Sequence, residues 1–213
     1  MKNKLLTTVI CLAVMGLIAM PISTAHARIT TQSLTVSATV STITDGLSLG
    51  LSKVVPGVGG AQDTWTVIPV SSGMAFGTLT LDPTYKVFKA ANYFALDVGV
   101  LDNSGTAWTI THAIQSVKKD LTNNLDSNIN VTFDKQLTST TANNLSKNTF
   151  ATSANKSFTK AQLDGGWLRI YYGIATGNTD PANGTVDNPG ALPITLNKAA
   201  GTYTGSVTIT LAP

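Results

Sequence analysis

The strongest constraint on the fold is a strict alternation of side chains near each end of the chain. In SLTVSATVST, residues 33–42, every second residue from Leu34 to Val40 is apolar and all the others are Thr or Ser. Successive side chains of a β-strand point to opposite faces, so this pattern predicts a strand with one buried and one solvated face. The apolar face carries Leu34, Val36, Ala38 and Val40.

The segment GTYTGSVTITL, residues 201–211, alternates in the same way and predicts the last strand. Chain ends usually fray, so two well-formed strands at the ends need partners that hold them in place. The apolar face of this second segment carries Tyr203, Val207, Ile209 and Leu211.

Residues 1–27 have the organisation of a secretory signal peptide. Lys2 and Lys4 precede an apolar run, and Ala25-His26-Ala27 forms a small-residue cleavage site. The apolar run is shorter than the roughly 20 residues that a membrane-spanning helix needs, which favours cleavage over an anchor. We therefore expect a secreted or cell-surface protein, exported through the periplasm in a Gram-negative host, with no membrane span after signal cleavage.

Composition after residue 27 excludes several kinds of chemistry. Cys11, the only cysteine, lies in the predicted signal, so the remaining 186 residues have no thiol and must fold without disulfides. They carry 12 basic and 11 acidic residues without a basic stripe, which argues against a nucleic-acid partner. Every acid is Asp, a turn former, and none is Glu, a helix former, so the acids favour strands and loops.

Between the two ends, short strand-like segments alternate with turn signals such as Asp45-Gly46 and Asp82-Pro83. This pattern predicts an all-β fold, an immunoglobulin-like antiparallel β-sandwich. We assign residues 28–43 to an N-terminal strand segment and residues 44–213 to the sandwich domain. The other expected strands are 47–55, 64–70, 74–81, 92–101, 107–114, 129–133, 167–175 and 191–196.

A long polar insertion is expected near residues 115–165 of the sandwich. Its one helical turn would begin at Ser157 as the cap and stop at Gly165. The Asn- and Thr-rich stretch 136–160 has few apolar residues, so we expect it to be exposed and to add little to the core.

We expect no catalytic residue, no cofactor and no metal site, and hence no enzyme. His112, the only histidine after the signal, lies within a predicted strand, where a half-buried structural role is favoured. Ser48 lies in a Gly-x-Ser-x-Gly match, but a nucleophile elbow needs a following helix and LSKVVPGVGG cannot form one. Asp97 alone interrupts an apolar strand, and the alternation places it on the solvent face.

Five aromatic residues raise the possibility of a carbohydrate-binding platform. Spaced Trp and Tyr in a β-sandwich are more often core residues, and we favour that interpretation. The alternative function is therefore a monomeric secreted β-sandwich module that binds carbohydrate or mediates surface adhesion. The residues concerned are Trp65, Trp108, Trp167, Tyr171 and Tyr172.

Three stretches of the chain resemble the family of spore coat protein U and the archaic chaperone–usher pilins. These are FGTLTL at 76–81, YYGIATGNTDP at 171–181 and the terminal GTYTGSVTITL. The resemblance implies an immunoglobulin-like sandwich that lacks one strand, which the N-terminal extension of a neighbouring subunit supplies. The chain departs from the family pattern in having no cysteine after the signal and in its long insertion.

The resemblance implies a structural subunit of an extracellular fibre, pilus or coat. Its partners would be other copies of the chain, a periplasmic chaperone and an outer-membrane usher. Segment 33–42 would be the donor strand, and its four apolar side chains would enter a groove in the neighbour. The groove would be lined by Phe76, Leu79, Tyr203, Val207, Ile209 and Leu211.

The residues leave a second placement of segment 33–42 open, in which it pairs within its own domain. A segment that is extended and unpaired in the lone subunit favours polymerisation, whereas pairing within its own sheet favours the monomeric module. A one-residue slip in either placement would turn the apolar row to solvent, so the alternation fixes the register.

Overall fold

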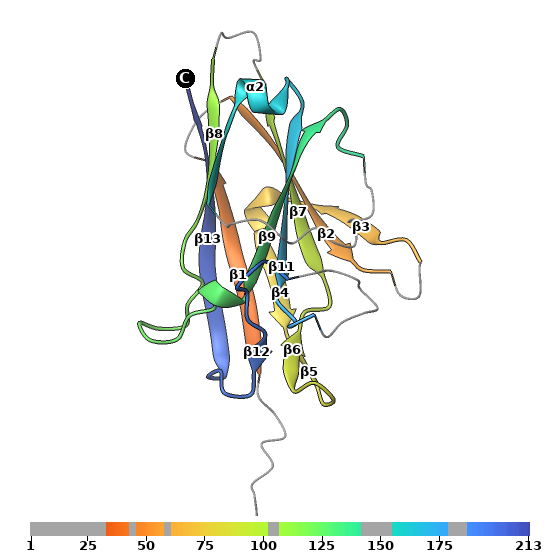
Figure 1. The fold of residues 1–213 in the computed structure, drawn as a ribbon, viewed down its shortest axis with the longest axis vertical. Helices are drawn as coiled ribbons and strands as arrows, with labels where there is room; N and C mark the ends of the chain where they lie inside the picture. Colours follow the sequence, from red (N-terminus) through yellow and green to blue (C-terminus); the bar gives the residue numbers. More distant parts are fainter. Residues whose placement is uncertain (1–32, 43–45, 58–60, 102–106, 142–154, 179–186) are drawn as a thin grey trace, which may run out of the picture. The chain divides into compact units, whose positions relative to one another are not determined.

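Figure 1 shows the computed structural model of the chain, in which residues 33–42, 46–57, 61–101, 107–141, 155–178 and 187–213 are described. The described residues belong to one compact unit, Gln32–Pro213. The described part of the N-terminal strand segment, residues 33–42, lies in this unit together with the strands of the sandwich. The predicted signal peptide lies outside the described residues.

Two five-stranded sheets and a three-stranded sheet form the unit, which confirms the predicted all-β sandwich. The first large sheet, sheet A, has the order β10-β8-β13-β1-β4. Its strands are β10 (Lys156–Thr159), β8 (Thr109–Ile114), β13 (Gly201–Ala212), β1 (Leu34–Thr42) and β4 (Met74–Thr78).

The second large sheet, sheet B, has the order β3-β2-β7-β11-β9, and the small sheet has the order β12-β6-β5. Neighbouring strands are antiparallel throughout, with the exception of the parallel pair β1 and β13. The strands of these sheets are β3 (Thr64–Ile68), β2 (Leu47–Val55), β7 (Tyr93–Val100), β11 (Trp167–Ile174), β9 (Ile129–Leu137), β12 (Ile194–Thr195), β6 (Val87–Lys89) and β5 (Thr80–Asp82).

The core lies between sheets A and B and contains side chains from both. Ile110 of β8 and Ile170 of β11 are fully buried in the same apolar cluster. Phe76 of β4 and Phe94 of β7 meet edge to face at 5.0 Å, a favourable aromatic geometry that links the two sheets. The inward face of 107–114 carries Trp108, Ile110 and His112 together, as the alternation predicts.

The segment predicted as one strand at 74–81 forms two strands instead, β4 and β5. Gly77 has a φ of +73°, a conformation that favours glycine, and the pairing of β1 with β4 shifts register between Val36 and Ser37. Leu79 lies in the break and is buried in the core. The backbone therefore turns β5 away into the small sheet.

The described part of the predicted insertion at 115–165 contains two edge strands, β9 and β10, a 3-10 turn, η2 (Asp126–Asn128), and one α-helical turn, α2 (Lys160–Leu163). Thr159, not Ser157, caps this turn in a capping box with Gln162. Phe158 of β10 is buried in the core, so the expectation that 136–160 adds little to the core is wrong at this end. Residues 142–154 lie outside the described residues.

No helix in the described part of the chain is long and apolar enough to cross a membrane.

A buried ion pair lies on the outer face of sheet B. The Arg169 Nε–H donates to Asp97 Oδ1 at 2.6 Å and its Nη2–H donates to Asp97 Oδ2 at 3.0 Å. The guanidinium also donates to the carbonyls of Thr140 and Thr141, and its carbon lies 4.9 Å from the centre of the Trp65 ring. Burial alone would lower the pKa of Arg169, but the hydrogen bonds and charge of Asp97 raise it. The expectation that Asp97 faces solvent is therefore wrong.

Asp97→Asn leaves the charge of Arg169 buried without its counter-charge. We expect the free energy of unfolding to fall by about 3–5 kcal/mol, because the guanidinium remains desolvated. Urea unfolding followed by tryptophan fluorescence measures the loss. Asp82→Asn is the control, since Asp82 pairs with Lys89 at 2.8 Å and both side chains reach solvent, at 19% and 21% exposed, so the loss should be far smaller. Equal losses in the two variants would contradict this assignment.

Candidate functional site

Strand β1 occupies an inner position of sheet A, between β13 and β4 (Figure 1). On one side Leu34–Thr42 pairs in parallel with Gly201–Ile209, and on the other side Thr35–Ala38 pairs with Met74–Thr78. The first described strand of the chain thus lies directly beside the last one, within the same molecule. The structure therefore places segment 33–42 in its own sheet.

The apolar row of β1 points into the core. Leu34, Val36 and Ala38 are 0%, 1% and 8% exposed, and Val40 is half-buried. On the opposite face, Thr35 and Ser37 are half-buried and Thr39 is exposed. The burial of the first three apolar residues confirms the predicted alternation. A slip of one residue would exchange the two faces.

The side chains of β13 and β4 define the groove that β1 fills. Tyr203 and Val207 lie opposite Val36 and Val40, and Ile209 lies opposite the last residue of β1. These three side chains of β13 are fully buried. The groove therefore has an apolar wall along the whole length of β1.

The other predicted groove residues are placed less uniformly. Phe76 and Leu79 are buried on the β4 side, and the Leu79 N–H donates to the Leu34 carbonyl at 2.8 Å. Leu211 lies beyond Ile209, the last residue of β13 that pairs with β1, and is half-buried. Leu211 therefore lies past the end of the groove.

Two groove residues escaped the sequence analysis. Met74 lies opposite Ala38 and is 1% exposed; it alternates with Phe76, so the period of two could have identified it. Gly205 also lies opposite Ala38, and a Cβ atom there would come within 2.7 Å of Val117. No local pattern reveals this need for glycine, because it arises from a segment distant in the sequence.

Tyr203 fixes the beginning of β13 and hence one end of the groove. Its hydroxyl donates to the Ala199 carbonyl at 2.7 Å, four residues upstream, in the manner of the tyrosine corners of β-sandwiches. Burial and the charge of Asp120 raise the pKa of the Tyr203 phenol, so the hydroxyl stays protonated and can donate. Gly201, with a φ of +140°, supplies the backbone conformation where the strand begins.

The residues considered for catalysis lie on different sheets. Ser48 is in β2 of sheet B, opposite Gly99, and the strand continues after it as expected. His112 is in β8 of sheet A, where its ring packs against Phe133 at 5.2 Å and Tyr172 at 5.7 Å. The histidine is fully buried, not half-buried as expected. Among the described residues, no group of three or more His, Cys, Asp or Glu side chains could hold a metal ion.

The five aromatic residues considered as a binding platform divide between two regions. Trp108 and Tyr172 belong to the main core. On the outer face of sheet B, Tyr171 is buried, and Trp65 packs edge-on against it at 6.5 Å. Trp167 is half-buried over Gly99. Most of their aromatic surface is therefore used for packing.

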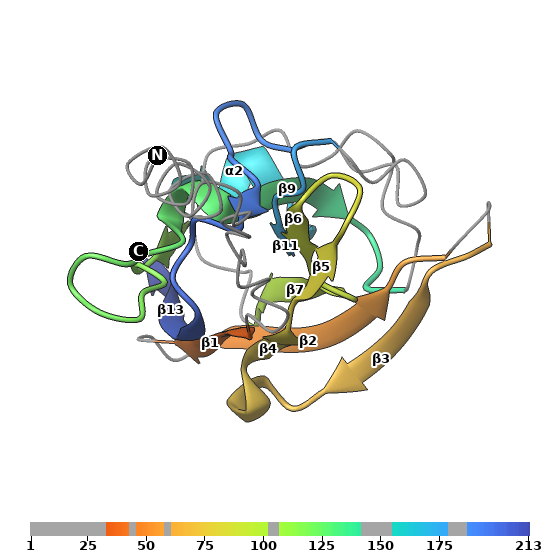
Figure 2. The same ribbon diagram turned by 90° about the horizontal axis from the view of Figure 1, so that it is seen from below.

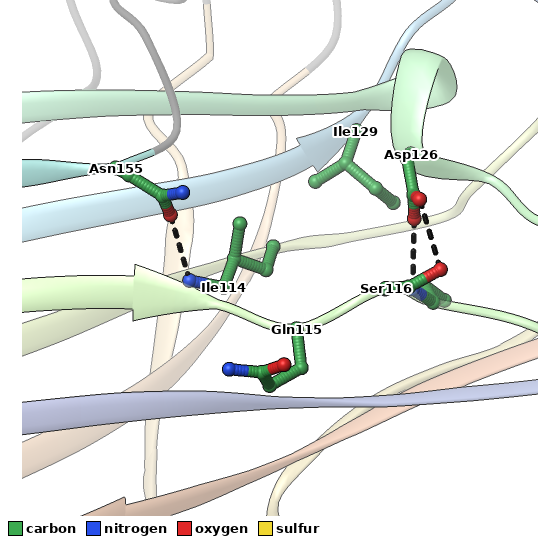
Figure 3. Close-up of a pocket in the computed structure, with 7 residues that line it drawn as sticks. Ile114, Gln115, Ser116, Asp126, Ile129 and Asn155 are labelled. Carbon is green, nitrogen blue, oxygen red and sulfur yellow. Dashed lines mark hydrogen bonds between the residues drawn. The ribbon is translucent and has the colours of Figure 1, made fainter.

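A cavity of about 230 Å³ lies between the end of β8 and the start of β9. Its polar side chains bond to the last residue of β8 and to the residues that follow it: Asn155 Oδ1 accepts from the Ile114 N–H, and Asp126 accepts from the Val117 N–H and the Ser116 hydroxyl (Figure 3). Side chains thus cap N–H groups where the pairing of β10 with β8 has ended.

No protein-family model matches the chain, and no curated protein or solved structure does. What the chain does must therefore be inferred from its own residues. Among the described residues, β1 and the groove around it form the most distinctive arrangement.

Val36→Asp places a carboxylate among apolar side chains in the groove. We expect the free energy of unfolding to fall by several kcal/mol, about 3 or more, since an unpaired buried charge has no compensating partner. Ser37→Asp is the matched control on the opposite face and should change stability by less than about 1 kcal/mol. Urea unfolding of residues 28–213 tests both; a larger loss for Ser37→Asp would show that the face assignment is wrong.

Proposed function

We propose that the chain is a structural subunit of an extracellular fibre, pilus or coat, in which β1 of one copy completes the sandwich of the next. The observation that carries the proposal is the position of β1. It is the first described strand, it continues into the rest of the fold only through its C-terminal end, and it fills an inner gap between β13 and β4. If β1 left the groove, the strands from β2 to β13 would still form one continuous stretch of chain.

The groove cannot remain empty at low cost. Burial of the Leu34 and Val36 side chains contributes about 1.5–3 kcal/mol each to the stability of the fold. If the groove were empty, these side chains and the apolar side chains that line the groove would be exposed to water. It would also leave unpaired backbone groups on β13 and β4, a template for aggregation. A strand of matching sequence must therefore occupy the groove.

The same strand from a second copy satisfies the groove equally well. It makes the same backbone hydrogen bonds and inserts the same apolar row, which is the logic of strand addition and of domain swapping. The chain's own β1 and a neighbour's β1 therefore make the same contacts in the groove. The balance between the two arrangements depends mainly on how the strand is connected to the domain and on the protein concentration. Before assembly, a subunit whose groove is empty would need a partner that binds there. The resemblance to the pilin family makes a periplasmic chaperone and an outer-membrane usher the candidate partners.

A monomeric secreted module is the second candidate, and one observation favours it. All nine residues of β1 pair with β13 of the same chain, the placement that the sequence analysis associated with a module. The carbohydrate version has less support, because Trp108, Tyr171 and Tyr172 are buried. The two candidate functions differ in whether β1 leaves its own groove.

A removable disulfide between β1 and β4 distinguishes them. Thr35 and Thr78 are cross-strand partners whose hydroxyl oxygens are 3.4 Å apart, so Thr35→Cys with Thr78→Cys places two thiols within bonding reach. Residues 28–213 contain no other cysteine. We expect the reduced double variant, refolded from urea at high concentration, to form a ladder of oligomers in size-exclusion chromatography. The oxidised form should remain monomeric because its β1 cannot leave.

Thr35→Cys alone is the control and should assemble equally well with and without oxidant, apart from covalent dimers that reductant removes. A reduced double variant that stays monomeric would support the self-contained module. Equal assembly of the locked and unlocked forms would show that copies associate without exchange of β1.

A further inference from the structure

The outer face of sheet A carries hydroxyl side chains on all five of its strands. The inward row of each strand is buried in the core, so the alternate residues point away from it. With a few alanines as exceptions, these outward residues are Thr or Ser. They are Thr35, Ser37 and Thr39 in β1, Thr202, Thr204, Ser206, Thr208 and Thr210 in β13, Thr109 and Thr111 in β8, Ser157 and Thr159 in β10, and Thr78 in β4.

These hydroxyls form rows across the sheet. Strands β1 and β13 lie side by side and in register, so Thr35 lies beside Thr202 (Figure 2). On the other side of β1, the hydroxyl oxygens of Thr35 and Thr78 are 3.4 Å apart. On the other side of β13, Thr111 lies opposite Thr210. Neighbouring strands are about 4.8 Å apart and alternate residues of one strand about 6.7 Å apart, so the hydroxyls repeat in two directions.

The chemistry of this face excludes several kinds of partner. In the described residues, its outward positions carry no charged side chain and no aromatic ring, and Lys118, which bridges to Thr204 beyond the end of β8, lies at its border. The outer face of sheet B, in contrast, carries the Asp97–Arg169 ion pair. An uncharged face complements an uncharged partner, and a face without aromatic rings gives a sugar no surface on which to stack.

A dry contact with a second copy of the same face is also a poor match. Each hydroxyl buried in such a contact loses its water and needs a new hydrogen-bond partner. Five strands of nine residues cover no more than about 700 Å², because strands are about 4.8 Å apart and rise about 3.3 Å per residue. A stable interface of standard size needs about 800 Å² from each partner. The face therefore suits a partner that offers a hydrogen bond to every hydroxyl.

We propose that the outer face of sheet A binds the ordered water at the surface of ice. A threonine hydroxyl both donates and accepts hydrogen bonds, as a water molecule of the lattice does. The branch at the Thr Cβ restricts side-chain rotation, so the hydroxyls are held at repeated positions before they meet the lattice. The two repeats of the array are close to the distances at which oxygen atoms recur on the prism faces of ice. Because sheets twist from strand to strand, the match is closest between neighbours such as β1 and β13.

This surface is separate from the groove that β1 fills. The groove uses the inward side chains Leu34, Val36 and Ala38, whereas the hydroxyl face uses the residues between them. Binding to ice therefore does not require exchange of β1. In an assembly of many copies, each subunit would present the same face, and several weak contacts with one crystal would add up.

Partition of the 28–213 chain into growing ice tests the proposal. Ice is grown slowly on a cooled probe from a dilute solution, and the fraction of protein that enters it is measured. We expect several-fold more of this chain in the ice than of a non-binding globular protein of similar size. Thr39→Lys with Thr204→Lys should abolish the enrichment, because two long charged side chains in the middle of the face hold the lattice away. Both threonines are exposed, and urea unfolding checks that the variant is folded.

Thr64→Lys with Thr66→Lys is the matched control, since it makes the same two changes at exposed threonines of β3 in sheet B. This control should enter ice as well as the unchanged chain does. Exclusion of the unchanged chain from ice to the extent of the non-binding protein, or equal partition of the two double variants, would overturn the proposal. Retention of the unchanged chain on crystalline cellulose that the Thr39–Thr204 variant loses would assign the face to a polysaccharide instead.

Discussion

The insertion of β1 between β13 and β4 is the contact on which the sandwich depends. Without β1, sheet A would divide into the group β10-β8-β13 and the isolated strand β4. The inserted strand also closes one side of the core, since Leu34 and Val36 are almost completely buried. The fold therefore relies on a strand that is joined to the rest of the domain at one end.

Sheet B is held together in a different way. Buried side chains on both faces of the sheet stabilise its strands. Apolar residues pack on the inner face, and the Asp97–Arg169 ion pair lies on the outer face. The Arg169 guanidinium donates hydrogen bonds to the carbonyls of Thr140 and Thr141, and these bonds hold the chain after β9 against the sheet. These contacts join elements far apart in the sequence, and none of them involves β1.

The sequence predicts the parts of the structure that depend on local alternation. The faces of β1, β8 and β13 follow from the period of two, because each has one face toward the core. Asp97 fails this rule because Arg169, distant in the sequence, pairs with it and the Thr140–Thr141 backbone covers the pair. Phe158 fails the compositional rule, since a single apolar residue in a polar stretch can still reach the core. The parallel pairing of β1 with β13 depends on the whole topology, and no local pattern contains it.

Native-state hydrogen exchange of the 28–213 chain tests most directly whether β1 is a removable strand. The amides that β1 shares with β13 and β4 should exchange together, through an opening that costs less free energy than global unfolding. The amides between β7 and β11 in sheet B should exchange only with global unfolding. If β1 amides have the same opening free energy and denaturant dependence as those of sheet B, β1 is an inseparable part of the domain and the account is wrong.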